Sequence, residues 1–256
     1  NILPQIAASH GFDVDIISYP DIAAIGGEVL LNNRQVSAEY VNGFRIGGVK
    51  LTFDGSPQGK TAWFTEPYLE APNGQPPEYL GYPAFTDEAA LAWMSLAFDN
   101  DWQLLVHTNG DAAIDQLIRL LKRSQSKLKN RDHRTVMIHG QFTRKGQIKS
   151  LKDLGIFPAL YPMHTFYWGD WHRDSVAGPE RAENISPTGW MIANDMRFSI
   201  HSDAPVTFPN SMRIMDSAVN RTTRTGKVLG AAHQLSPMQA LKALTIWAAY
   251  QHFEES

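Results

Sequence analysis

The stretch QLLVH at residues 103–107, followed by DAAIDQLIRLLKR at residues 111–123, decides the fold. A short apolar run that ends at a polar residue is typical of a buried strand. In the second stretch, apolar residues recur at i, i+3, i+4 and i+7, which is the period of an amphipathic helix that Asp111 would cap. The two stretches together predict one strand–helix unit.

Similar units lie on both sides of this one. The other predicted strands cover residues 14–19, 45–53, 135–139, 156–161 and 197–200. Helices are expected from Thr143 to Gly155 and after Ser186-Pro187. Strands that alternate with helices predict a parallel sheet with right-handed crossovers. Because neither G-x-G-x-x-G nor G-x-x-x-x-G-K-[ST] occurs, an open doubly wound sheet is disfavoured, and we expect an α/β fold of the (β/α)8 TIM-barrel type.

The predicted barrel is incomplete. We count about six strand–helix units where the closed barrel needs eight, and residues 55–85 read as a long loop rich in proline, glycine and aromatics. The chain opens inside an apolar-periodic stretch, and it ends soon after the helix signal SPMQ at residues 236–239. We therefore expect one barrel domain over residues 1–256, as a fragment of a longer protein whose first strands lie before residue 1.

Composition excludes several classes of function. The 256 residues carry a formal charge of −3 without a Lys/Arg-rich run, which disfavours nucleic acids and anionic membranes as partners. No apolar stretch reaches the ~18 residues of a membrane span. The absence of cysteine excludes disulfides and thiolate metal sites. The composition is ordinary for a soluble protein; cytoplasm and periplasm stay open as compartments, as does a homo-oligomer.

Polar residues end several of the predicted strands, at the edge where barrels carry their chemistry. In GVKLTFD, residues 48–54, alternation places Lys50 on the face opposite to Val49 and Leu51. If the apolar residues face the helices, Lys50 points into the barrel, where an unpaired ammonium is costly. Taken alone, this lysine is most simply explained by a salt bridge.

His107 and His139 end two strands of nearly identical design, 32 residues apart. One such histidine is more often a packed core residue, but two on adjacent strands indicate a metal site, since imidazole is a preferred zinc ligand. Asp203 lies where the strand in SIHSDAPV becomes a loop. An aspartate there is more often a turn former, yet beside a metal it would be a ligand and a base for water.

Four motifs occur in an order that resembles the amidohydrolase superfamily, specifically its amidohydrolase-3 branch, which includes N-substituted formamide deformylases. They are GVKLTFDG (48–55), HTNGDAAID (107–115), IHGQ (138–141) and SDAPV (202–206). The resemblance implies hydrolysis of an amide- or formamide-type C–N bond by attack of metal-bound hydroxide. The metal is one or two divalent ions, with zinc as the first choice and iron, manganese or nickel as alternatives.

The same resemblance implies a role for each strand-end residue. Lys50 would be carboxylated and bridge two ions, His107 and His139 would hold the more exposed ion, and Asp203 would hold the buried ion and carry the proton. The family also uses a His-x-His pair for the buried ion and a flanking β-sandwich. No His-x-His occurs in these 256 residues, so the inner site is incomplete here. In addition, Gly140 stands where relatives more often have alanine, and His201 replaces a usual glycine.

Further residues are expected near the substrate. His164 would contact it or stabilise an oxyanion, although a loop histidine without function is an equal alternative. Arg181 would bind a substrate carboxylate unless it is a surface arginine. Trp63, Tyr82 and Trp168 suggest an apolar or aromatic small-molecule substrate, unless these aromatics only anchor their loops.

Two rival functions remain from the sequence. The first is a deaminase or lactonase of the same superfamily. The second is a non-catalytic barrel in which Lys50 and Asp203 form a buried ion pair and the histidines simply pack.

Overall fold

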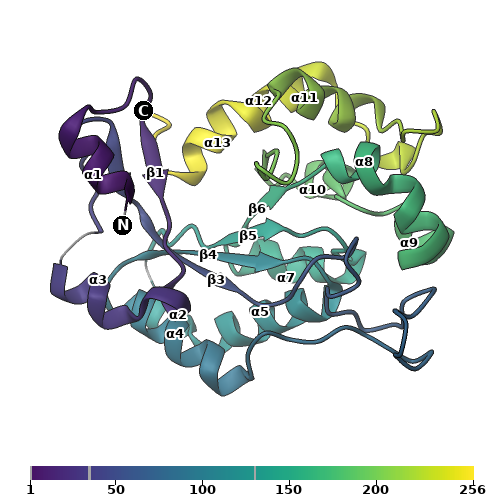
Figure 1. Ribbon diagram of the computed structural model, residues 1–256, viewed down its shortest axis with the longest axis horizontal. Coiled ribbons are helices and arrows are strands. Elements are labelled where there is room, and N and C mark those ends of the chain that lie inside the picture. Colours follow the sequence, from purple (N-terminus) through teal and green to yellow (C-terminus); the bar gives the residue numbers. More distant parts are fainter. Residues whose placement is uncertain (1, 34–35, 130) are drawn as a thin grey trace.

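A computed structural model describes residues 2–33, 36–129 and 131–256 (Figure 1). The strands, in chain order, are β1 (Ile16–Ser18), β2 (Phe44–Ile46), β3 (Gly48–Thr52), β4 (Gln103–Thr108), β5 (Val136–His139), β6 (Phe157–Leu160) and β7 (Ser199–Ile200). The α-helices are α1 (Ile2–Ser9), α2 (Ile22–Ile25), α3 (Gly27–Asn33), α4 (Asp87–Asp99), α5 (Asp111–Arg123), α6 (Gln125–Leu128), α7 (Ile148–Asp153), α8 (Met163–Trp171), α9 (Gly178–Ala182), α10 (Thr188–Ala193), α11 (Ser211–Asn220), α12 (Pro237–Leu244) and α13 (Ile246–Gln251).

The strands form two parallel sheets. Strands β3 to β7 are hydrogen-bonded in sequence order, while β1 pairs with β2. In Figure 1, α4, α5 and α7 lie on one side of β3–β5, and α11 to α13 lie on the opposite side of the molecule. Helices α12 and α13 contact β7. The predicted α/β fold with parallel strands is confirmed, and residues 55–85 form a loop as predicted.

The predicted strand 45–53 is divided between the two sheets. Gly47 lies between β2 and β3, and a Cβ on it would come within 2.6 Å of Ile17. A Cβ on Gly48 would lie 2.1 Å from the backbone oxygen of Gln103. Glycine permits these close approaches where the chain changes partner. The Lys50 N–H then donates to Pro20 O at 2.9 Å, so the chain after β1 runs beside β3 and the six predicted strands stay in their predicted order.

The sheet does not close into a barrel within the described part of the chain. No pairing joins β7 to β1 there, because the strands present fall short of the eight that closure needs. The incomplete (β/α)8 barrel that the sequence predicts is therefore not confirmed by these residues and stays a prediction. Across the same described residues, no helix has the length and apolar character required to cross a membrane.

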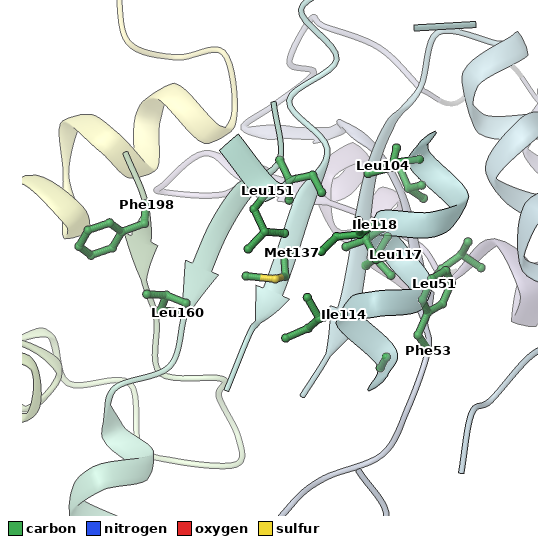
Figure 2. Packing of buried hydrophobic residues seen from close by; sticks show 14 of the residues in the cluster. Leu51, Phe53, Leu104, Ile114, Leu117, Ile118, Met137, Leu151, Leu160 and Phe198 are labelled. Carbon is green, nitrogen blue, oxygen red and sulfur yellow. The ribbon is translucent and has the colours of Figure 1, made fainter. Parts of the chain in front are cut away.

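The core lies between the sheet and its helices. Val49, Leu51 and Phe53 are fully buried, whereas Lys50 and Thr52 on the other face are half-buried. This is the alternation that the sequence predicts. Figure 2 shows the packed side chains of Leu51, Phe53, Leu104, Met137 and Leu160 from the strand region and Ile114, Leu117, Ile118 and Leu151 from α5 and α7. These contacts hold β3–β6 rigidly and fix where their ends lie.

Two predicted helix caps are wrong. Helix α5 is preceded by Gly110 as its N-cap, and the Asp111 carboxylate instead accepts hydrogen bonds from the Thr65 backbone N–H and hydroxyl. Thr143 caps no helix, because its hydroxyl donates to Gly140 O at 2.7 Å and α7 begins only at Ile148. Asp111 is engaged by the loop residue Thr65 and Thr143 by a local turn, so neither side chain caps a helix. The capping box at Ser236, with proline at the first helical position, is confirmed.

The C-terminal segment forms hydrogen bonds and an ion pair with residues at the amino ends of the strands. Gln103, the first residue of β4, donates from Nε2 to Gln251 O at 2.7 Å. Ser199, the first residue of β7, donates to Gln251 Oε1 at 2.6 Å. Arg134, before β5, pairs with Glu255 at 2.8 Å. Residues 251–255 therefore cover the amino ends of the strands and leave the carboxyl ends open for a site.

A buried arginine joins two loops near the carboxyl ends of the strands. Arg221 is fully buried, and its guanidinium donates to Leu229 O at 2.7 Å, Ile185 O at 2.7 Å and Ser186 O at 3.2 Å. Burial lowers the pKa of Arg221 to about 10, so the group stays charged at neutral pH. One buried guanidinium cation thus supplies the hydrogen-bond donors for three backbone carbonyls.

We predict that Arg221→Met lowers the free energy of unfolding by about 3–5 kcal/mol, because the buried carbonyls lose their donors. Urea denaturation followed by circular dichroism measures this change. The control is Arg213→Met, since Arg213 is 43% exposed and pairs with Asp216 at the surface. The control should change stability by less than about 1 kcal/mol. Equal effects of the two substitutions would contradict the anchoring role of Arg221.

Candidate metal centre

A cluster of histidines lies at the carboxyl ends of the parallel strands. His107 Nδ1, at the end of β4, is 3.0 Å from His139 Nε2 at the end of β5. The rings of His139 and His201 have their centroids 5.1 Å apart. His139, His201 and Asp203 each offer a ligand atom, and these atoms lie within 4.8 Å of one another. The structure thus brings together His107, His139 and Asp203 and adds His201, a residue without a predicted role.

The backbone of β5 aims His139 at this cluster. Pairing in the sheet places His107 opposite Ile138 and His139 opposite Thr108, so simple alternation would put His139 on the face of Met137. His139 has a φ of 71°, in the left-handed region that non-glycine residues seldom adopt. This turn brings its ring to His107. Asp203 also has a left-handed φ, of 53°. Such outliers cluster at functional sites.

Gly140 makes the turn at His139 sterically feasible. Its φ is 51°, and a Cβ at this position would lie 2.5 Å from the Met137 methyl carbon and 3.1 Å from the Thr143 hydroxyl. An alanine here would therefore be strained and crowded. Glycine, in place of the more usual alanine, therefore suits the positive φ and the limited space at this position.

Contacts with two loops orient the His107 ring. His107 Nε2 lies 3.1 Å from the Gly55 carbonyl oxygen and 3.0 Å from Asn109 Nδ2. Its Nδ1 then faces His139. Burial lowers the pKa of His107 to about 4, which keeps the ring neutral. A backbone carbonyl that orients a neutral imidazole in this way is the usual support of a metal-binding histidine.

Asp54 holds the loop behind His107. Its buried carboxylate accepts backbone N–H bonds from Trp63 at 2.9 Å, Asn109 at 2.9 Å and Gly110 at 2.7 Å. Burial raises the pKa of Asp54 to about 7, and the three N–H donors oppose that rise. Asp54 therefore fixes the start of the loop 55–85 against the β4–α5 turn. The sequence analysis gave it no role, although its position at the end of a strand, before glycine, is the signal that could have found it.

Two nitrogens of the cluster have no hydrogen-bond partner. His139 Nδ1 and His201 Nε2 are both buried and unpaired among the described residues. Burial holds the pKa of His139 well below its usual value and lowers the pKa of His201 to about 4, so both rings are neutral. An unpaired buried polar atom costs about 1–3 kcal/mol, which a bound cation would offset. Neutral imidazoles beside a carboxylate fit a divalent ion that prefers nitrogen and oxygen ligands.

Lys50 faces the cluster without pairing to it. Burial raises the pKa of Asp203, and the positive charge of Lys50 opposes this rise. The ammonium also interacts electrostatically with His107, His139 and His201. Within the described residues the Lys50 side chain makes no hydrogen bond and no ion pair within 4.0 Å. The Lys50–Asp203 ion pair of the non-catalytic alternative is therefore not formed.

His164 lies beside the cluster and is held by a second histidine. The side chain is 3% exposed, and its Nδ1 is 2.8 Å from His172 Nε2, with the two rings stacked at 9°. Trp168 packs against the same ring at a centroid distance of 4.9 Å. His172 lies in a π-helical turn after α8, a feature that is frequent at functional sites. His172 had no predicted role, because it lies far from any predicted strand end.

The other predicted substrate residues lie in or against the long loop. Trp63 is half-buried and packs against the main core, while Tyr82 is 54% exposed. Arg181 donates to the carbonyls of Ala177 at 2.8 Å, Glu66 at 3.2 Å and Pro67 at 2.5 Å. Through these contacts Arg181 anchors the loop 55–85. A surface pocket of about 260 Å³ is lined by Arg181, and none of the histidines lines it.

Comparisons with known proteins show which family this chain resembles. The sequence pattern of the amidohydrolase family matches residues 3–256. The chain is 28% identical over 214 residues to Protein LONG AFTER FAR-RED 3 of Arabidopsis thaliana, covering 81% of this chain and 35% of that protein. It is 30% identical over 154 residues to N-substituted formamide deformylase of Arthrobacter pascens, covering 57% of this chain and 27% of that protein.

A solved structure shares the fold. The crystal structure of an uncharacterized metal-dependent hydrolase from Pyrococcus furiosus superposes with a TM-score of 0.83 at 21% identity, covering 99% of this chain and 49% of that chain. The chain thus spans less than half the length of these three proteins. Because the family pattern extends over nearly every residue, and the resemblance of the four motifs agrees with it, the chain belongs to the amidohydrolase family.

Proposed function

We propose that this chain forms the catalytic side of a metal-dependent hydrolase that cleaves an amide- or formamide-type C–N bond in a small molecule. The observation that carries the proposal is the 3.0 Å contact between His107 and His139, next to Asp203 and to two buried ring nitrogens without partners. We further propose that residues 1–256 are one domain whose parallel strands belong to a (β/α)8 barrel.

The donor set suggests how the residues share the metal. His107 and His139 would hold one ion, since two nitrogens 3.0 Å apart can both reach a centre whose nitrogen ligands lie at about 2.0–2.1 Å. Zinc is the first choice, while iron, manganese and nickel also suit nitrogen and oxygen ligands. When bound, the ion supplies Lewis-acid activation of water and of the substrate carbonyl.

Side chains of this chain would accept and transfer the protons of the reaction. Asp203 is half-buried, and burial raises the pKa of its carboxylate, which makes it a better acceptor for a proton of the attacking water. The same proton would then pass to the leaving nitrogen. We further propose that Lys50, for which the described residues provide no hydrogen bond or ion pair, becomes carboxylated and then serves as an anionic metal ligand.

The surroundings of the cluster suggest the substrate contacts. His164 is fixed by His172 and by Trp168, so its ring would meet a substrate oxygen without reorganisation. Trp168 adds an apolar face beside this ring. Trp63, Tyr82 and Arg181 are proposed as outer contacts of a substrate with an aromatic or apolar substituent.

The reaction class is tested with a panel of small molecules and the purified protein. We predict that N-substituted formamides release formate and the amine, measured by chromatography, and that a metal chelator abolishes this release until zinc is restored. A simple lactone and an aminated heterocycle serve as the rival substrates. Turnover of only the lactone, or release of ammonia from the heterocycle, would replace the proposed reaction by lactonase or deaminase activity.

We predict that Asp203→Asn lowers kcat/KM roughly 10²–10⁴-fold, because the amide cannot accept the proton and is a weaker ligand. Steady-state kinetics on the substrate found above measure the effect. His10→Asn is the control, since His10 is exposed and lies after α1. The control should keep kcat/KM within about twofold of the unaltered protein, as expected of an exposed residue away from the site. Equal rates for Asp203→Asn and the control would remove Asp203 from the mechanism.

A further inference from the structure

We propose that His201 is a metal ligand, and that His139, His201 and Asp203 form a three-residue site for an ion within this chain. The inference rests on the proposed metal-dependent function and assigns a residue that neither the motifs nor the predicted ligand set contains.

The position of His201 is fixed by its backbone and by an aromatic neighbour. It directly follows β7, and its N–H donates to Leu160 O at 3.1 Å. Its ring stacks on Tyr161 at a centroid distance of 5.0 Å and an angle of 19°. The Tyr161 hydroxyl in turn donates to Thr207 Oγ1 at 2.8 Å, which holds the stacked ring in place. His201 is therefore preorganised, as a ligand should be.

The chemical environment of His201 distinguishes it from other buried histidines. Its Nε2 is buried without a partner, while the ring lies against the carbonyl of Ala159. His233 also has a buried unpaired ring nitrogen and an aromatic neighbour, Trp190, but belongs to no cluster of ligands. Among the described residues, His139, His201 and Asp203 form the one group of three or more such side chains whose ligand atoms converge.

Two imidazoles and one carboxylate form a donor set with a definite preference. Such a set suits zinc in four-coordinate geometry and leaves the fourth position for water or substrate. A neutral imidazole has one lone pair, so His139 would hold one ion at a time, either this ion or the one proposed beside His107. We therefore expect the chain to bind its first ion at His139, His201 and Asp203.

The test measures metal binding directly. Metal-free protein is titrated with Zn²⁺ in competition with a chromophoric chelator, and with Co²⁺ as a spectroscopic probe of the ligands. His201→Asn shortens the side chain, while His201→Phe keeps the ring on Tyr161 and removes both nitrogens. We predict that each weakens Zn²⁺ binding roughly 10- to 100-fold or more and alters the visible spectrum of bound Co²⁺. His233→Asn, the matched control, should change neither.

The outcomes separate this inference from the function on which it rests. If the unaltered protein binds Zn²⁺ and His201→Phe binds it equally well, His201 is a packing residue and the inference is overturned, while the hydrolase proposal stands. If the unaltered protein binds neither Zn²⁺ nor Co²⁺, the metal-dependent function itself fails. Circular dichroism of the metal-free variants identifies any loss of folding, and the variant that remains folded then decides.

Discussion

The contact between the His107 and His139 imidazoles is the constraint on which the rest of the site depends. It joins the ends of two neighbouring buried strands and exists because the chain leaves β5 with a left-handed turn. The Gly55 carbonyl helps to orient the His107 ring, and Gly140 permits the turn. Each support comes from a different loop, so the packing of the strands below is what keeps the two ring nitrogens close together.

The amino ends and the carboxyl ends of the strands have different roles. At the amino ends, Gln251 and Glu255 bind residues that begin or precede three strands, and these contacts stabilise the sheet. At the carboxyl ends, polar groups lie buried without partners, which costs stability. This division is typical of α/β proteins whose chemistry sits at the carboxyl ends of parallel strands. The buried guanidinium of Arg221 fixes loops around that end.

Sequence reasoning located the strands and their order because each is a short apolar run with a polar end, a pattern set locally. It placed His107, His139 and Asp203 near one another for the same reason. It could not find the break at Gly47, the turn at His139 or the pairing of His164 with His172. The break at Gly47 and the loss of Asp111 from the helix cap depend on contacts between segments far apart in the chain. The turn at His139, the pairing of His164 with His172 and the bond of Thr143 to Gly140 are local, but no apolar periodicity indicates them.

The central claim is that the lone pairs of this histidine cluster share a metal ion. Crystals of the protein soaked in Zn²⁺ and measured at the zinc absorption edge test it most directly. The account predicts an anomalous peak at the carboxyl ends of β4, β5 and β7, within bonding distance of His139 and Asp203. Zinc bound at full occupancy at another place, with no zinc bound to the rings of His107, His139 and His201, would contradict it.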